Sequence, residues 1–225
     1  KWGAIVHDQP LLVEEEIGYI GEPICIFACS NRYDLEEIKK LFTFDILAKE
    51  GVFTLEEALK KNNLLYAAPK PFVQGDIKKG FEESEYILEG SFYSGGQEHF
   101  YMESQASVAY PMENGQIEVH SSSQHPSETQ RLVAEALGLS FQQVVCIVKR
   151  LGGGFGGKES QAAPIAVYAA LVASKFNRAA RLILTKDEDM KITGKRHPFY
   201  SEYKVGFSNE GLINALKVKL NADAG

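Results

Sequence analysis

The sequence predicts a mixed α+β fold, and three observations support this prediction. Short apolar segments of β character alternate along the chain with segments that begin at helix-capping residues. A glycine-rich run at 152–157 separates a strand-like segment from a long apolar helix-like one. With 225 residues, the chain can form one large domain or two small ones. We expect a small α/β unit over residues 1–69 and a larger mixed α+β domain over residues 70–225.

The N-terminal unit is expected to contain one strand and two short helices. Residues 17–27 have the composition of a strand, with glycines that permit a bend. An Asp or a Thr followed three residues later by Glu forms a capping box, and this signature predicts helices over 34–41 and 55–61. The connector at 70–75 contains proline and is the expected domain boundary.

The larger domain is expected to alternate strands and helices. In chain order, the expected elements are a short helix at 76–83, strands at 86–93, 104–110 and 117–121, a helix at 128–137, a strand at 144–148, a helix at 160–175, and strands at 180–184, 200–207 and 213–221. Ser127 and Gln130 form the capping box predicted for the helix at 128–137, and Gly138 is its expected end. The charged segments 187–189 and 191–197 are interpreted as a solvated connection.

Composition excludes several classes of protein. The net charge is −6 without a basic stripe, which argues against a nucleic-acid partner. The longest apolar stretch, 162–173, is shorter than the ~20 residues of a membrane span, and no signal peptide opens the chain. Cys25, Cys29 and Cys146 form no disulfide framework, and the first two are interpreted as core residues of the predicted strand. A reducing, cytoplasmic setting is therefore expected. Because the sequence begins without a methionine and stops directly after an apparent strand, a piece of a longer polypeptide is also expected.

The glycine-rich run is the most informative motif. Five of the six residues at 152–157 are glycine, so the backbone can adopt positive φ and its N–H groups can approach an anionic ligand. The run fits parts of the dinucleotide-binding and P-loop patterns, but Glu159 occupies the position where a P-loop needs a hydroxyl to hold Mg²⁺. A nucleotide-binding module is thus disfavoured, and a turn that merely permits close packing is the simpler alternative.

Two further clusters could carry chemistry. Within 95–103, Glu98 and His99 could form an acid–base pair or begin a metal site, although a hydrogen-bonded loop that supports a neighbouring site is the favoured interpretation. Within 121–127, Gln124 offers both a donor and an acceptor and so suits binding an oxo group or a cofactor amide.

Four ordered motifs, at 95–103, 122–126, 152–159 and 189–198, together resemble the molybdenum-binding subunit of xanthine dehydrogenases, within the molybdenum hydroxylase family. The resemblance covers nearly the whole chain. It implies that residues 1–69 are part of a hammerhead-like N-terminal unit and that 70–225 are the first molybdopterin-binding domain.

The resemblance also implies roles for individual residues. Gln124 matches the glutamine that hydrogen-bonds the apical oxo ligand of molybdenum, and Phe155 and Gly156 match the loop whose backbone amides contact the metal centre. Glu159 matches a carboxylate that hydrogen-bonds a purine substrate, where similar aldehyde oxidases usually have an apolar residue. Some members have a basic residue at the position of Glu128, so a substrate role for this residue is in doubt.

The implied activity is oxidation of hypoxanthine and xanthine to urate with water-derived oxygen. Electrons would leave through 2Fe–2S clusters and FAD to NAD⁺, carried by other domains or subunits of a homodimeric complex. The catalytic base glutamate, a substrate-orienting arginine and an aromatic pair are expected beyond Gly225, so this chain alone is expected to be inactive. An aldehyde or N-heterocycle oxidase and a non-catalytic scaffold member are the alternatives.

Overall fold

The computed structural model describes residues 1–3, 5–65 and 71–224. The chain forms two compact units, and each unit combines two separate stretches of sequence. The first unit combines residues 1–44 with 98–195, and the second combines 45–97 with 196–225. Each unit is built on its own sheet, and the predicted mixed α+β class is confirmed.

The first unit is built on a four-stranded sheet in the order β4-β3-β2-β5. Its strands are β2 (Ala106–Pro111), β3 (Ile117–Ser121), β4 (Val144–Ile147) and β5 (Ala180–Ile183). β2 pairs antiparallel with both β3 and β5, whereas β3 and β4 are parallel. A parallel pair needs a crossover connection, which α4 (Pro126–Leu137) provides together with the short 3-10 helix η3 (Phe141–Gln143).

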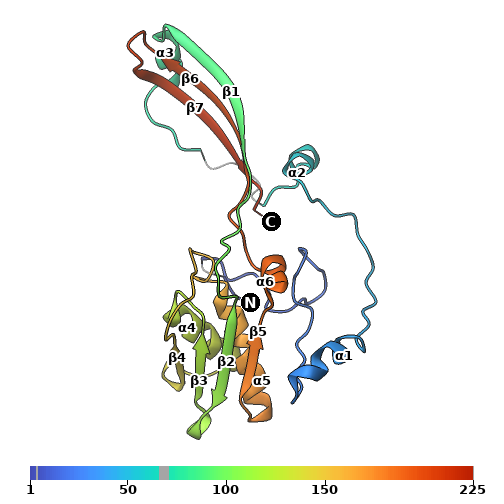
Figure 1. Cartoon of the computed structure of the whole chain (residues 1–225). Coiled ribbons are helices and arrows are strands. Elements are labelled where there is room, and N and C mark those ends of the chain that lie inside the picture. Colours follow the sequence, from blue (N-terminus) through green and yellow to red (C-terminus); the bar gives the residue numbers. More distant parts are fainter. Residues whose placement is uncertain (4, 66–70, 225) are drawn as a thin grey trace. The chain divides into compact units, whose positions relative to one another are not determined.

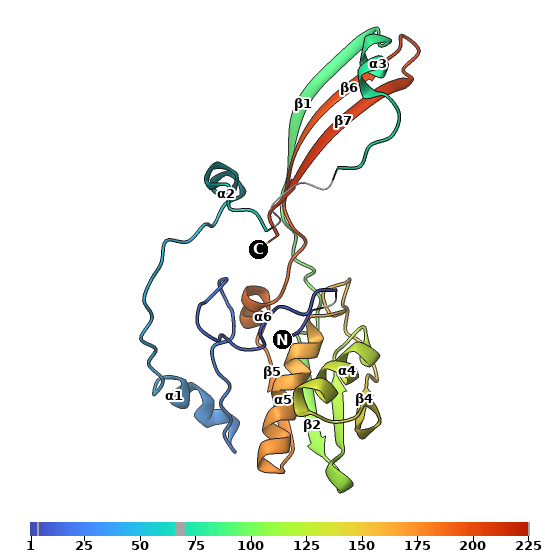
Figure 2. The same ribbon diagram turned by 180° about the vertical axis from the view of Figure 1, so that it is seen from behind.

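Two helices, α4 and α5 (Ala162–Phe176), cover one face of this sheet, as Figure 2 shows. Alanines line the buried side of α5, and Ala166, Ala170 and Ala173 have no exposed surface. Small side chains let the helix approach the sheet closely, and Val119 and Val133 fill the shared core.

The helix α6 (Lys186–Ile192) corrects the sequence interpretation of residues 187–189 as part of a solvated connection. Thr185 and Glu188 form a capping box that starts the helix. Asp189 is only 2% exposed and is hydrogen-bonded inside the unit. A run of three acidic residues thus includes one whose carboxylate faces the interior.

The N-terminal part of the first unit contains the 3-10 helix η1 (Arg32–Asp34) and the helix α1 (Leu35–Lys39). The strand predicted at 17–27 is wrong, because the chain turns at Gly21, where φ is +92°. The Glu22 carboxylate accepts a hydrogen bond from the Gly18 N–H at 2.6 Å, which closes this turn. Without a strand there is no core face for the cysteines, and Cys25 is exposed instead of buried.

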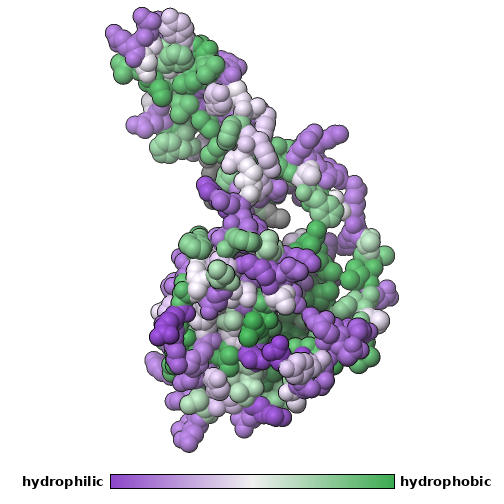
Figure 3. All heavy atoms as spheres, in the orientation of Figure 1, coloured by the Kyte–Doolittle hydropathy of each residue, from purple (hydrophilic) through white to green (hydrophobic). Residues whose placement is uncertain are grey.

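The second unit contains the three-stranded antiparallel sheet β1-β6-β7 (Figure 1). Its elements are α2 (Leu55–Lys61), α3 (Ile77–Glu82), β1 (Tyr86–Ser94), β6 (Phe199–Phe207) and β7 (Ile213–Ala222). α3 packs on the face that carries Gly206 and Ala215, and the opposite face carries Leu88, Val205 and Leu216. Hydrophobic side chains gather over this sheet in the view of Figure 3.

The capping predictions are confirmed at some helix ends and wrong at others. Thr54 caps α2 as predicted, and Gly138 ends α4 with φ +66°. α4 begins at Pro126, two residues before the predicted start, because His125 is its N-cap and proline fits the first helical position. Asp34 makes no capping hydrogen bond.

The domain boundary expected between residues 69 and 70, at the start of the connector 70–75, stays a prediction, because residues 66–70 lie outside the described part of the chain. No helix among the described residues is long and apolar enough to cross a membrane.

Candidate cofactor-binding site

The glycine-rich loop connects β4 to α5 and has an unusual backbone. Gly153 and Gly156 have φ values of +91° and +92°, which glycine adopts without steric cost. Phe155 also has a positive φ, +53°, although its side chain disfavours this region. The Phe155 side chain is 74% exposed, so packing of the ring does not account for the conformation. The backbone hydrogen bonds around the loop do.

Gln124 supplies those hydrogen bonds from the connection between β3 and α4. Its Oε1 accepts from the N–H groups of Gly156 at 3.0 Å and Lys158 at 3.1 Å. Its own backbone N–H donates to the carbonyl of Lys158 at 2.9 Å. A Cβ at Gly154 would lie 2.4 Å from Gln124 Oε1, so this close approach requires glycine. The two sequence-predicted motifs are therefore one structural site.

This geometry leaves hydrogen-bond donors available. Because Oε1 is directed to the loop, the Nε2 group of Gln124 must point elsewhere, and it has no partner in the described part of the chain. The N–H groups of Gly153, Gly154 and Phe155 likewise have no partner among the described residues. A concentration of unpaired donors on a glycine backbone favours an anionic or oxo ligand.

Glu159 follows the loop directly and is exposed. Its N–H donates to the Gly156 carbonyl at 3.4 Å, which places it at the end of the same turn. Its carboxylate has no hydrogen-bond or ion-pair partner among the described residues. A charged acceptor beside a donor-rich loop can bind N–H groups of a ligand.

Lys158 behaves differently from a phosphate-binding P-loop lysine. Its side chain has no exposed surface, and its Nζ lies 2.9 Å from Oε2 of Glu103 and 4.6 Å from the centroid of the Tyr101 ring. An ammonium group held in this way is directed into the protein and away from any ligand on the loop. The sequence pattern did not indicate that this lysine is buried.

The segment before β2 supports the glycine loop. The sequence favours a supporting role for Glu98 and His99, and Glu98 indeed pairs with Lys195 at 2.9 Å. An ideal Cβ at Gly157 would lie 2.7 Å from the His99 ring, so the imidazole packs directly against the glycines. The described residues include no group of three or more His, Cys, Asp or Glu able to hold a metal ion.

A buried polar network, missed by the sequence analysis, joins this segment to α6. The Tyr101 hydroxyl donates to Asp189 at 2.6 Å, and the N–H of Gln105 donates to the other carboxylate oxygen at 2.6 Å. Gln105 Nε2 then donates to the carbonyl of Gly157 at 3.0 Å, so the network reaches the glycine loop. Burial and the neighbouring Asp189 carboxylate raise the pKa of Tyr101, which keeps its hydroxyl protonated as a donor.

Glu128, four positions after Gln124, is engaged on its own helix. Its carboxylate accepts two hydrogen bonds from Arg131, at 2.6 Å and 3.1 Å. This bidentate pair lowers the pKa of Glu128 despite its partial burial. Nothing in this arrangement directs the carboxylate to the glycine loop.

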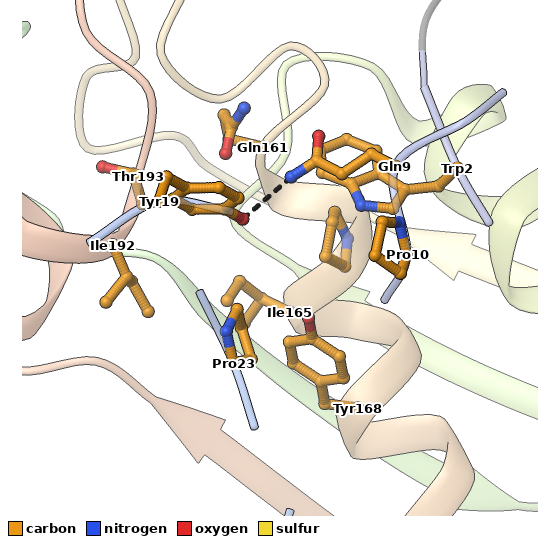
Figure 4. A pocket seen from close by; sticks show the side chains of 11 residues that line it. Trp2, Gln9, Pro10, Tyr19, Pro23, Gln161, Ile165, Tyr168, Ile192 and Thr193 are labelled. Carbon is orange, nitrogen blue, oxygen red and sulfur yellow. Dashed lines mark hydrogen bonds between the residues drawn. The ribbon is translucent and has the colours of Figure 1, made fainter. Parts of the chain in front are cut away.

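The cavities of the first unit lie apart from this loop. Figure 4 shows one of them, lined by aromatic and polar side chains that include Trp2, Tyr19 and Tyr168, with Gln9 donating to the Tyr19 hydroxyl. Its volume of about 30 Å³ has room for roughly one water molecule. A second, larger hollow is lined by apolar residues of 24–28 and by the last turns of α5. Neither provides the donors that surround Gln124.

Comparison with known proteins decides the family. The family model of the molybdopterin cofactor-binding domain matches residues 56–225. The chain belongs to this family. The xanthine dehydrogenase of Blastobotrys adeninivorans is 41% identical over all of this chain, and that of Dictyostelium discoideum is 39% identical over 99% of it. This chain spans 16% of the length of each of these two relatives.

Solved structures show the same fold. Quinoline 2-oxidoreductase from Pseudomonas putida 86 superposes with a TM-score of 0.84 over 94% of this chain and 28% of that one, at 22% identity. The aldehyde oxidoreductase from Desulfovibrio gigas superposes with a TM-score of 0.58 over 65% of this chain and 16% of that one, at 26% identity. The fold class expected from the sequence is thus confirmed by these structures.

The residues of the loop fit the molybdopterin cofactor of the family. Gln124 Nε2 and the loop N–H groups are donors without partners in the described part of the chain, as a cofactor rich in oxygen acceptors requires. An ideal Cβ at Gly156 meets nothing within 4 Å, so space for a ligand lies directly beside the loop.

Proposed function

We propose that this chain is the cofactor-holding part of a molybdenum-dependent purine hydroxylase that converts hypoxanthine and xanthine to urate. The observation that carries the proposal is that Gln124 is hydrogen-bonded to the glycine loop, directly beside Glu159. The Glu159 carboxylate has no hydrogen-bond or ion-pair partner among the described residues. The similarity to xanthine dehydrogenases over the whole chain supports it.

In this proposal, the chain contributes binding and orientation. Gln124 Nε2 and the N–H of Phe155 would hold the cofactor by donating hydrogen bonds to its oxygen acceptors. Gly156 contributes an open backbone beside the cofactor, while its own N–H holds Gln124 in place. The bound cofactor supplies the redox chemistry that transfers a water-derived oxygen to the substrate. The preorganised amide directions reduce the cost of ordering the site when ligands bind.

Glu159 is proposed to bind the purine. A hydroxylated purine presents ring N–H donors, and an ionised carboxylate forms strong hydrogen bonds with them. Because no other described side chain engages this carboxylate, binding a purine does not require an existing ion pair to break. An aldehyde offers no comparable donor. An aldehyde or N-heterocycle oxidase of the same family is the second candidate, and an aldehyde substrate would make little use of Glu159.

The substrate assignment is tested by Glu159→Ala in the complete protein. Purine turnover, measured as kcat/KM for hypoxanthine, is expected to fall by at least about tenfold, because a hydrogen bond to a charged group contributes ~1.5–3 kcal/mol. Turnover of an aromatic aldehyde is expected to change much less. Glu210→Ala, in the exposed turn between β6 and β7, is the control and should affect neither. An equal loss for both substrates would contradict the assignment of Glu159 to purine binding.

The remaining partners belong to the complete protein. We infer that 2Fe–2S clusters and FAD in other domains or subunits receive the electrons, within a homodimer in the cytoplasm. Metal analysis of that protein tests the cofactor assignment and separates it from a non-catalytic scaffold. Molybdenum with iron, flavin and hypoxanthine-dependent dye reduction is the expected result. A folded protein from molybdenum-replete cells without molybdenum would remove the roles given to Gln124 and Phe155.

A further inference from the structure

Glu103 connects the two ends of the glycine loop. Its Oε2 accepts hydrogen bonds from the Gly152 N–H at 3.0 Å and from Lys158 Nζ at 2.9 Å. Its backbone N–H donates to the Gly152 carbonyl at 3.0 Å. A Cβ on Gly152 would lie 2.5 Å from Cβ of Glu103, so the two segments are in direct contact. One side chain thus binds the residues at positions 152 and 158 together.

Lys158 depends on this carboxylate. Its side chain is completely buried, and Glu103 is the only acidic group within ion-pair distance in the described part of the chain. The ring of Tyr101 provides a second, weaker contact to the ammonium. A buried charge that loses its counter-ion is strongly unfavourable. Neutralising Glu103 would therefore destabilise the charged Lys158 side chain in its buried position.

Lys158 is also the residue that binds Gln124 twice through its backbone. Its N–H donates to Gln124 Oε1, and its carbonyl accepts from the Gln124 N–H. A displacement of Lys158 therefore releases the side-chain amide whose Nε2 faces away from the loop. The path from Glu103 through Lys158 to Gln124 consists of consecutive contacts and involves no other residue.

We propose that Glu103 is a positioning residue of the cofactor site, which fixes the glycine loop through Gly152 and Lys158 and thereby presents Gln124 Nε2 and the loop N–H groups to the cofactor. Glu103 does not touch the cofactor itself. The cofactor half of this inference rests on the proposed function, whereas the effect on the loop does not.

The test is Glu103→Gln in the complete protein, which keeps the shape and removes the charge. Amide hydrogen exchange of a peptide covering 150–159 is expected to become at least about tenfold faster, while peptides from the core of α5 stay unchanged. Molybdenum content per chain should fall, and the metal should be lost faster during dialysis. Glu202→Gln is the matched control, because Glu202 pairs with Lys219 at 3.4 Å in the second unit and contacts no glycine of the loop.

A merely structural role gives a different result. In that case exchange would rise across the whole first unit along with a lower melting temperature, and this outcome would overturn the proposal. Wild-type exchange at 150–159 would overturn it as well. Should Glu103→Gln fail to fold, Glu103→Asp, which keeps the charge one methylene shorter, is expected to give the same local effect at a smaller size.

The two proposals fail separately in this experiment. If the wild-type protein contains no molybdenum, the proposed function fails, but the exchange of 150–159 still decides the role of Glu103. If wild type and Glu103→Gln bind molybdenum equally while exchange at 150–159 rises, the loop clamp exists but does not position the cofactor, which overturns the inference and leaves the proposed function standing.

Discussion

At the scale of single residues, the partly buried Cys146 thiol gives a prediction about reactivity. It lies in β4, and burial raises the pKa of the Cys146 thiol to about 11. The thiolate is the reactive form, so alkylation by iodoacetamide at mildly alkaline pH is expected to be slow in the native protein and rapid after unfolding. Mass spectrometry of the labelled peptide measures this. Equal rates in the native and unfolded protein would contradict the burial of this thiol.

The raised pKa of Cys146 also determines the direction in which the stability of the folded protein changes with pH. Because the folded pKa of Cys146 is raised above the usual value of ~8.5, the folded protein binds the proton more tightly than the unfolded chain. The contribution to stability is complete below the unfolded pKa and is lost as the pH rises through about 11.

Sequence reasoning at the residue scale singled out Gln124 and the glycine loop but not the residues that hold the loop. The structure brings Gln124 and the loop together through two hydrogen bonds, while their roles toward a cofactor stay predictions. Glu103 and Lys158 have no pattern of their own, since they are 55 residues apart and meet only through the fold. Such a pair can be inferred only when the burial of Lys158 is known, because a buried lysine without a partner is rare.

At the scale of elements, one buried carboxylate on α6 joins this helix to the segment before β2. Asp189 accepts from the Tyr101 hydroxyl, the Gln105 N–H and the Thr193 hydroxyl. Asp189→Ala is expected to lower the free energy of unfolding by about 2–5 kcal/mol, because it leaves two or more buried donors without an acceptor at ~1–3 kcal/mol each. Chemical denaturation measures the loss.

Asp187 provides the matched control for this prediction. It has the same side chain in the first turn of the same helix but is exposed. Asp187→Ala should cost no more than the ~0.3–1 kcal/mol of a favourable helix-dipole interaction. Similar losses for both variants would show that charge near the helix start, and not the buried network, determines the effect.

Elements were predicted best where local pattern and tertiary environment agree. The expected strand at 117–121 coincides with β3 and the expected helix at 55–61 with α2. The strand at 17–27 was wrong, because its β-forming side chains find no neighbouring strand among the described residues. The interpretation of 187–189 as a solvated connection was wrong because three consecutive acidic residues are typical of an exposed segment. In the structure, the Asp189 carboxylate instead accepts hydrogen bonds from buried donors.

At the scale of the whole molecule, the roles proposed for this chain are cofactor binding and substrate binding. It spans 16% of the length of each of the two xanthine dehydrogenases compared with it. That the base glutamate, the orienting arginine and the purine-stacking aromatic pair belong to other parts of the complete protein stays a prediction from the resemblance. Within the described residues, Glu159 is the acidic group that follows the glycine loop directly, and its proposed role is binding rather than proton abstraction.

The isolated 225-residue chain is therefore expected to show no hypoxanthine oxidation even when it is supplied with cofactor. Positioning alone leaves the proton-transfer step uncatalysed, and general-base catalysis typically contributes ~10²–10⁴-fold in rate. The measurement is hypoxanthine-dependent dye reduction by equal amounts of the cofactor-supplied chain and of the complete protein, with molybdenum content determined for both. Turnover by the short chain comparable to that of the complete protein would show that the base lies within these 225 residues. In that event Glu159 would be the first residue to substitute, because its carboxylate is exposed, has no partner among the described residues and lies next to the loop that holds Gln124.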